Sequence, residues 1–159
     1  MKNKGLPSSS ELREIFSYCD ETGLLTRRSN AQEIKGPPSQ PYVQVAIEGS
    51  IYSAHTVIWK MIYGEHRRWI DHINGDGRDN RLCNLRAATP AQNRWNSRIG
   101  RRNKSGVKGV CWESSRRKWR MSIATNGELI VRRFDRLEDA QTAIAEIRRQ
   151  MHGDFARVA

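Results

Sequence analysis

Four side chains within residues 69–93 have the types and order of a hydrolytic site. Asp71 and His72 are adjacent, and Asn84 and Asn93 follow along the chain. Carboxylate and amide oxygens are hard ligands that suit Mg²⁺. A neutral imidazole can accept a proton from water, because the unperturbed pKa of histidine is about 6.5. We therefore predict that Asp71 and Asn93 hold one divalent metal ion, Mg²⁺ with Mn²⁺ as the alternative, and that His72 is the general base.

Two short strands and a helix must bring these side chains together. The segments "WID" and "LRAAT" are typical of strands, and a polar loop joins them. Thr89 can cap a helix with Pro90 at its first position, which places Asn93 in the first turn. The order strand, loop, strand, helix brings the end of the first strand against the start of the helix.

Adjacent strand residues face opposite sides of a sheet. Asp71 and His72 can therefore serve one site only if the strand ends or kinks there, which the glycines at 75 and 77 permit. Asn84 is expected to hydrogen-bond the loop backbone and hold the histidine in place, and we count it with His72 as catalytic. The alternative interpretation is a turn rich in Asn and Asp whose polar groups only satisfy one another.

The same stretch, "DHINGDGRDNRLCNLRAATPAQN", resembles the HNH nuclease motif, in the cysteine-free form of phage homing-type endonucleases. Its three signature positions match His72, Asn84 and Asn93, and Asp71 matches the aspartate before the histidine. The segments "YCDETGLLTRR" and "AHTVIWKMIYGE" also resemble such enzymes, so the resemblance covers roughly residues 10–97. It implies a ββα-metal fold, one divalent ion and a histidine base. His55 matches a histidine often present in these enzymes, and we interpret it as structural.

The charge of the chain indicates a polyanionic partner. There are 28 Lys and Arg against 17 Asp and Glu, a formal net charge of +11. Residues 98–159 hold 15 basic and 7 acidic residues, which is +8 of that total. We predict double-stranded DNA as the partner, with no membrane and no small-molecule substrate. The oligomeric state is not readable from the sequence.

The three cysteines are widely spaced, with no CxxC pair, so a thiolate zinc site is not expected. A sparse, odd set of cysteines fits a reducing compartment. With no signal-peptide or membrane-spanning pattern, we expect a cytoplasmic protein, in a bacterial host cell if the phage resemblance holds.

The elements before the motif are a helix, a turn into a strand, and a hairpin leading to a second helix. Residues 8–19 place Leu12, Ile15 and Phe16 at helical spacing after a serine cap. Residues 42–55 alternate as a hairpin, and residues 55–66 predict a helix that stops at Gly64.

The C-terminal part predicts three strands and one helix. The segments "VKGVCWE", "KWRMSIAT" and "ELIVRRF" are strand-like, and Asn126-Gly127 is a strong hairpin turn between the last two. A helix follows with an expected capping box of Asp135 and Glu138. We predict an α+β protein with a nuclease domain at 1–96, a basic linker at 97–105 and a DNA-binding domain at 106–159.

Residues 105–158 resemble the plant ethylene-response-factor (APETALA-type) DNA-binding domain in "SGVKGVCW", "KW", "NG" and "HGDFARV". The resemblance implies a three-stranded sheet in the major groove, backed by one helix. Pairing around Asn126-Gly127 places Trp119 opposite Phe134 and Ile123 opposite Ile130, on the face for the helix. The other face pairs like charges, which favours phosphate contacts. The predicted DNA-binding residues are Lys108, Arg116, Arg117, Lys118, Arg120 and Arg133.

Together these features predict a metal-dependent DNA endonuclease of phage homing type that nicks one strand or cuts both. The alternative is a non-catalytic DNA-binding regulator that uses the HNH fold as a scaffold.

Overall fold

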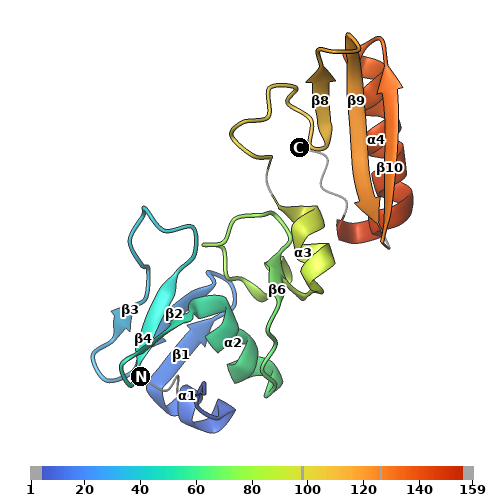
Figure 1. Ribbon diagram of the computed structural model, residues 1–159. Coiled ribbons are helices and arrows are strands. Elements are labelled where there is room, and N and C mark those ends of the chain that lie inside the picture. Colours follow the sequence, from blue (N-terminus) through green and yellow to red (C-terminus); the bar gives the residue numbers. More distant parts are fainter. Residues whose placement is uncertain (1–4, 98, 126, 156–159) are drawn as a thin grey trace. The chain divides into compact units, whose positions relative to one another are not determined.

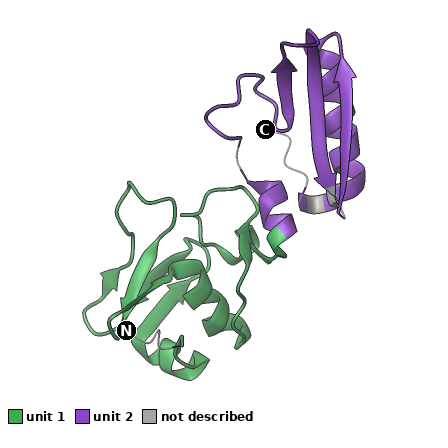
Figure 2. Cartoon of the chain, in the orientation of Figure 1, with its two compact units in different colours: residues 1–90 green, residues 91–159 purple. Residues whose placement is uncertain are grey.

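A computed structural model describes residues 5–97, 99–125 and 127–155 of the chain (Figure 1). The fold is α+β, as predicted, with small antiparallel sheets and four α-helices in the described residues. The chain divides into two compact units, residues 1–90 and 91–159 (Figure 2). This division falls inside the predicted nuclease domain, and the domain bounds given by the sequence stay a prediction.

The first unit begins with helix α1, Ser9–Ile15, whose start carries the expected serine cap. Ser8 and Glu11 form a capping box there. The helix was expected to continue through Phe16, and this was wrong. Phe16 has extended backbone angles (φ −127°, ψ 151°) and begins strand β1, Phe16–Cys19, because pairing with β2, Leu24–Arg27, overrides the local helical pattern.

A short strand β3, Gln32–Glu33, pairs with β2 and was not predicted from the sequence. The elements that follow it in this unit have the predicted order. The hairpin consists of β4, Gln44–Ile47, and β5, Ser50–Ser53. Helix α2, Ala54–Tyr63, ends at Gly64 in the left-handed conformation, as predicted.

A strand, a 3₁₀ turn and a second strand carry the predicted motif. Strand β6 is Ile70–His72, η1 is Leu82–Asn84, and β7 is Leu85–Ala87. Strands β6 and β7 pair antiparallel. Helix α3, Pro90–Asn96, follows with the proline at its first position, as expected.

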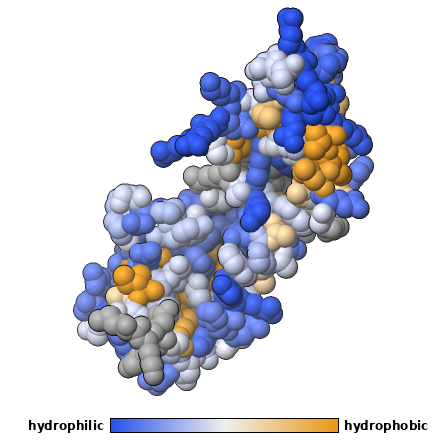
Figure 3. Space-filling view, in the orientation of Figure 1, coloured by the Kyte–Doolittle hydropathy of each residue, from blue (hydrophilic) through white to orange (hydrophobic). Residues whose placement is uncertain are grey.

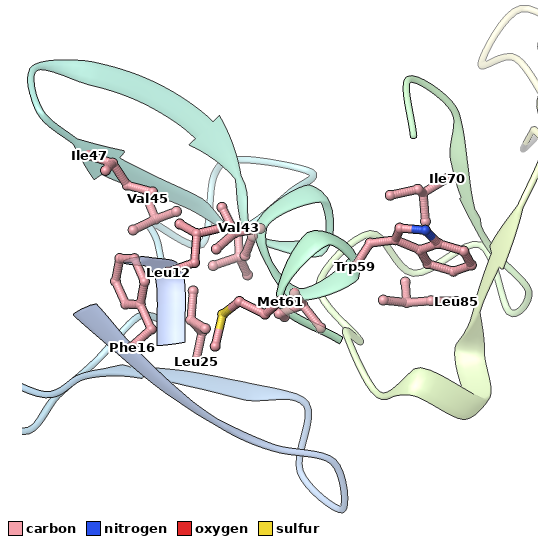
Figure 4. Close-up of a cluster of buried hydrophobic side chains, with 13 residues drawn as sticks. Leu12, Phe16, Leu25, Val43, Val45, Ile47, Trp59, Met61, Ile70 and Leu85 are labelled. Atoms are coloured by element: carbon pink, nitrogen blue, oxygen red, sulfur yellow. The ribbon is translucent and has the colours of Figure 1, made fainter. Parts of the chain in front are cut away.

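One hydrophobic core holds the first unit together and supports the motif (Figure 4). Leu12, Phe16 and Leu25 are fully buried between α1, the β1–β2 hairpin and α2. In the same core, Trp59 from α2 lies against Ile70 of β6 and Leu85 of β7 (Figure 4). Helix α2 therefore anchors the two motif strands to the rest of the unit.

The second unit contains a three-stranded antiparallel sheet in the order β10-β9-β8, covered on one face by helix α4. The strands are β8, Val110–Glu113, β9, Lys118–Thr125, and β10, Glu128–Phe134. Helix α4 spans Leu137–His152, and a 3₁₀ turn η2, Gly153–Phe155, follows it.

The register of β9 and β10 confirms the prediction. Trp119 pairs with Phe134, Ile123 with Ile130, and Arg120 with Arg133. Asn126 of the predicted turn lies outside the described residues, as does the end of the "HGDFARV" segment. The apolar face packs on Ala140, Ile144 and Ile147 of α4.

The expected capping box of α4 is wrong. The helix begins one residue later, with Arg136 as its N-cap and no side-chain cap bond. Asp135 instead accepts from Nζ of Lys118 at 2.8 Å, so an ion pair between strand and loop takes the place of the cap.

None of the described helices has both the length and the apolar character needed to cross a membrane. Hydrophilic side chains cover most of the visible face of each unit (Figure 3).

Candidate active site

Strand β6 includes both Asp71 and His72 and ends at His72. A turn closes immediately after it, where the amide of Gly75 donates to the carbonyl of His72 at 2.8 Å. Gly75 adopts a positive φ of 69°, which explains the glycine at this turn. Asp71 and His72 are both only 4% exposed.

The imidazole of His72 lies in a cluster of polar and aromatic side chains. Its Nε2 is 3.2 Å from Oδ1 of Asn80. The ring of His55 meets it edge-on, with centroids 5.0 Å apart and an interplanar angle of 89°, and Tyr42 lies 5.8 Å away. These contacts fix both the position and the plane of the ring.

Burial lowers the pKa of His72 below its usual value. The hydrogen bond to Asn80 and the negative charges of Asp71, Asp76 and Asp79 oppose this effect without reversing it. The imidazole is therefore neutral at pH 7, which is the state that can accept a proton.

The carboxylate of Asp71 lies beside an arginine that the sequence analysis missed. Nε and Nη2 of Arg86 each donate to Oδ2 of Asp71, both at 2.8 Å. The two residues are cross-strand partners in the β6–β7 pair. Both strands were predicted from the sequence, which could have suggested that Asp71 has a cross-strand partner. The long loop between the strands left their register unspecified, so Arg86 could not be identified as that partner.

Asn84 hydrogen-bonds the backbone of the loop through both ends of its side-chain amide. Its Oδ1 accepts from the amide of Asn74 at 2.9 Å, and its Nδ2 donates to the carbonyl of Asp79 at 2.7 Å. Asn84 thus spans the loop 73–84 and fixes its two sides.

Local Asn and Asp turns also shape this loop, as the alternative interpretation expected. Oδ1 of Asn74 accepts from the amide of Asp76, and Oδ1 of Asp76 accepts from the amide of Arg78, at 2.8 and 3.0 Å. Some polar residues therefore serve the loop itself, while Asn80 contacts the histidine.

Distant segments of the first unit hold the loop from two sides. The guanidinium of Arg78 donates to the carbonyls of Lys35, Pro37 and Gln40 at 2.7, 2.9 and 3.2 Å. From the β1–β2 hairpin, Oδ1 of Asp20 accepts from the amide of Leu82 at 3.0 Å. The loop is thus rigidly supported.

Asn93 lies on α3, in the second unit. Its partnership with Asp71 in metal binding therefore stays a prediction. Among the described residues, no group of three or more His, Cys, Asp or Glu side chains could hold a metal ion.

Several predicted DNA-binding cations of the second unit already have protein partners. Glu113 pairs with Arg116 at 2.9 Å and with Arg133 at 2.7 Å, and Lys118 pairs with Asp135. Glu113 thereby offsets the repulsion expected between Arg120 and Arg133. Arg120 is half-buried and Arg117 is exposed.

Lys108 has a structural role that the sequence did not indicate. Its Nζ donates to the carbonyls of Arg94, Trp95 and Ser97 at 2.8, 2.9 and 2.7 Å. These carbonyls lie at the C-terminal end of α3, where a cation satisfies the free acceptors of the helix. Lys108 therefore caps the helix that carries Asn93.

Comparisons with known proteins identify the motif region. Residues 52–95 match the family model described as HNH endonuclease. The chain is 35% identical over 105 residues to protein 3.8 of Escherichia phage T7, across 65% of this chain and 87% of that protein. No solved structure matches the chain.

Proposed function

Because this chain belongs to the protein family that includes protein 3.8 of Escherichia phage T7 and carries an HNH endonuclease domain, we propose that it is a metal-dependent DNA endonuclease. The observation that carries the proposal is the buried, neutral His72 at the end of β6, inside the matched segment. A neutral imidazole held in one orientation is suited to deprotonate an attacking water.

In the proposed reaction His72 accepts a proton from water as the water attacks the scissile phosphorus. The water oxygen bonds to phosphorus and the P–O bond to the 3′ oxygen breaks. The 3′ oxygen takes a proton from solvent, and the imidazole releases its own proton to solvent afterwards. Asn84 and Asn80 act earlier, because they hold the loop and the ring in place before DNA binds. Their contribution is orientation.

Asp71 and Asn93 are the residues that would hold a divalent ion, and their oxygens suit Mg²⁺, with Mn²⁺ as the alternative. The buried carboxylate of Asp71, at the end of a strand, fits such a ligand. When bound, the ion supplies positive charge that stabilises the phosphate and the leaving 3′ oxygen.

The second unit is proposed to bind double-stranded DNA as an APETALA-type domain. Its sheet-on-helix fold and the register of Arg120 and Arg133 support this. The cations Lys108, Arg116, Arg117, Lys118, Arg120 and Arg133 supply phosphate contacts in this proposal, with Arg117 and Arg120 the most available because the other four bind protein acceptors.

We place the activity in the cytoplasm of a bacterial host, as a phage homing-type enzyme that acts on DNA without a membrane or small-molecule substrate. One active site per chain favours a nick in one strand, and a dimer would cut both.

The ion pair of Asp71 with Arg86 favours one competing function, a non-catalytic DNA-binding regulator. In that case the pair would be purely structural and Asp71 would hold no metal.

A plasmid-nicking assay tests the proposal. The full-length protein should convert supercoiled plasmid to open circles with Mg²⁺ or Mn²⁺, and a chelator should abolish the conversion. Tight DNA binding with no cleavage under any divalent metal would favour the regulator instead.

A further inference from the structure

The hydrogen bond between His72 and Asn80 determines which ring nitrogen of the histidine carries the proton. We propose that Asn80 is a positioning residue that holds His72 as the Nε2–H tautomer, so that Nδ1 is the nitrogen that accepts the proton of the attacking water. This inference rests on the proposed function, since it names the atom that performs the proposed proton transfer.

The two hydrogen-bonding ends of the Asn80 amide are distinguished by their surroundings. Its Nδ2 donates to the carbonyl of Arg78 at 3.4 Å, so Oδ1 is the end that faces Nε2 of His72, at 3.2 Å. An amide oxygen can only accept a hydrogen bond, so Nε2 must be the donor. A neutral imidazole has one protonated nitrogen, and Nδ1 then carries the lone pair.

An amide suits this task better than a carboxylate would. A carboxylate at the same position would also accept from Nε2, but its charge would favour the protonated imidazole. Asn80 is 3% exposed, so its hydrogen bond is shielded from competing water. The asparagine fixes the tautomer without adding a charge beside the base.

The β1–β2 hairpin holds the backbone of Asn80 in place. The hydroxyl of Tyr18 donates to the carbonyl of Asn80 at 2.9 Å, and burial raises the pKa of Tyr18, which keeps this donor protonated. A Cβ on Gly23 would lie 2.8 Å from the carbonyl carbon of Asn80, so the hairpin is seated directly on this residue. The positioning device thus extends outside residues 52–95, the segment that matches the HNH family.

The aromatic neighbours of His72 support the same orientation. Rotation of the ring by half a turn would remove Nε2 from Asn80, and His55, edge-on with its ring centroid at 5.0 Å, packs against the ring in its present plane. The packing therefore holds the plane of the ring, and the hydrogen bond to Asn80 selects one of the two flipped orientations in that plane.

The tautomer is measured directly by ¹⁵N NMR of the full-length labelled protein at pH 8, with the His72 signals assigned by their loss in His72→Gln. We expect the proton on Nε2 in the wild type. The same proton should remain in Asn80→Asp, which keeps an acceptor. Asn80→Leu, of similar size without an acceptor, should show a mixture of tautomers.

Cleavage provides the second readout. Loss of an outer-shell partner of a metal ligand typically costs about 10–100-fold in metal affinity or activity, and we expect a loss of similar size in nicking rate for Asn80→Leu. Asn80→Asp should retain more activity than Asn80→Leu. The control Asn30→Ala removes an exposed asparagine whose side chain accepts from the amide of Gln32 in its own turn, and this variant should nick like the wild type.

A wild-type His72 with its proton on Nδ1 would overturn the inference, and that measurement needs no variant to fold. Wild-type nicking by a folded Asn80→Leu protein would also overturn it. Failure of the proposed function looks different, because the wild type would then not nick while the NMR result would still decide the tautomer.

Discussion

The carboxylate of Asp71 has two partners in this account, the arginine seen in the structure and the metal ion proposed for the reaction. Arg86 holds one oxygen of Asp71 through two nitrogens, which orients the carboxylate at the end of β6. A ligand that is held by a neighbouring donor is oriented before the ion binds. The structural pair and the proposed metal role are therefore compatible at this residue.

Asp71→Asn and Asn93→Ala should each weaken metal binding, because each removes or weakens one of only two proposed protein ligands. We expect about a tenfold or greater rise in the Mg²⁺ or Mn²⁺ dissociation constant by calorimetry, with part of the cleavage rate restored at high metal concentration. Asp76→Asn is the matched control, since it removes a nearby charge from a loop turn. Unchanged metal affinity in both variants would show that these residues are not the ligands.

The buried His55 should make the stability of the protein depend on pH. Burial, and then the positive charge of His72, lower the pKa of His55 to about 3 from a usual value of 6.5. Between these values the unfolded chain binds a proton that the folded chain refuses, so stability is complete above pH 6.5 and falls as the pH drops toward 3. The loss approaches about 1.4 kcal/mol per pH unit in this window.

Urea unfolding at pH 7 and pH 5 measures this effect. The wild type should lose about 2 kcal/mol more than His55→Gln between the two pH values. His66→Gln, which changes an exposed histidine, should behave like the wild type. Equal pH dependence in all three proteins would mean that His55 is protonated freely in the folded state.

At the residue scale, the sequence indicated which residues belong to the candidate site, but it did not indicate which side chains they would contact. His72 and Asn84, which the sequence analysis selected by residue type and spacing, are both almost inaccessible in the structure, and their catalytic roles stay predictions. The contact of Asn80 with His72 could not be predicted, because it depends on a loop conformation fixed by Tyr18 and Asp20 from another part of the chain.

Among the elements, the β1–β2 hairpin has the most unexpected role, since it supports the motif loop from outside the motif. Gly23, at its turn, has a positive φ of 72°, and a Cβ there would lie 2.6 Å from the amide nitrogen of Arg81. The glycine is needed both for its backbone conformation and for this close approach. The hairpin and the loop can meet only with a glycine at this position.

Gly23→Ala should therefore destabilise the protein more than Gly49→Ala. Both residues have a positive φ, but a Cβ on Gly49 meets nothing within 4 Å. Left-handed backbone costs about 1–2 kcal/mol for alanine at either site, and overpacking at Gly23 adds roughly 1–3 kcal/mol. Urea unfolding measures the difference, and Gly23→Ala should also nick more slowly. Equal losses in the two variants would mean that the hairpin does not press on the loop.

The elements also show where sequence patterns specify a register. The expectation of a two-residue turn at Asn126-Gly127 predicted the pairing of β9 with β10, and the predicted partners are correct. The long loop 73–84 imposes no such register on β6 and β7, so the Asp71–Arg86 pair was missed. The end of α1 was misplaced because Phe16 suits either a helical or a strand face until its partner strand is known.

In the whole molecule, most of the net positive charge and the proposed catalytic base lie in different parts of the chain. The segment 98–159 carries +8 of the net +11, whereas the proposed base lies in residues 1–90. Deleting residues 100–159 should weaken DNA binding strongly and flatten its salt dependence. Each lost phosphate contact reduces the slope of log affinity against log salt by roughly 0.9. Fluorescence anisotropy at several salt concentrations measures both, and an unchanged slope would place the DNA footprint on the nuclease domain.

The deletion also removes Lys108, whose side chain caps the C-terminal end of α3. A point variant is therefore needed to distinguish the loss of this helix cap from the loss of a positive charge that attracts DNA. Lys108→Ala and Lys104→Ala each remove one positive charge, but Lys104 is exposed. Compared with Lys104→Ala, Lys108→Ala should lower the free energy of unfolding by about 1 kcal/mol more and should slow cleavage more. If the two variants had the same stability and the same cleavage rate, Lys108 would contribute only its positive charge.

The central claim is that His72 takes the proton from water during DNA cleavage, and single-turnover plasmid nicking with Mg²⁺ tests it most directly. His72→Ala should lose about 10²–10⁴ in rate while its circular dichroism and melting show a folded protein. His66→Ala, at an exposed histidine of the same unit, should nick at the wild-type rate. A folded His72→Ala protein that nicks as fast as the wild type would contradict the account.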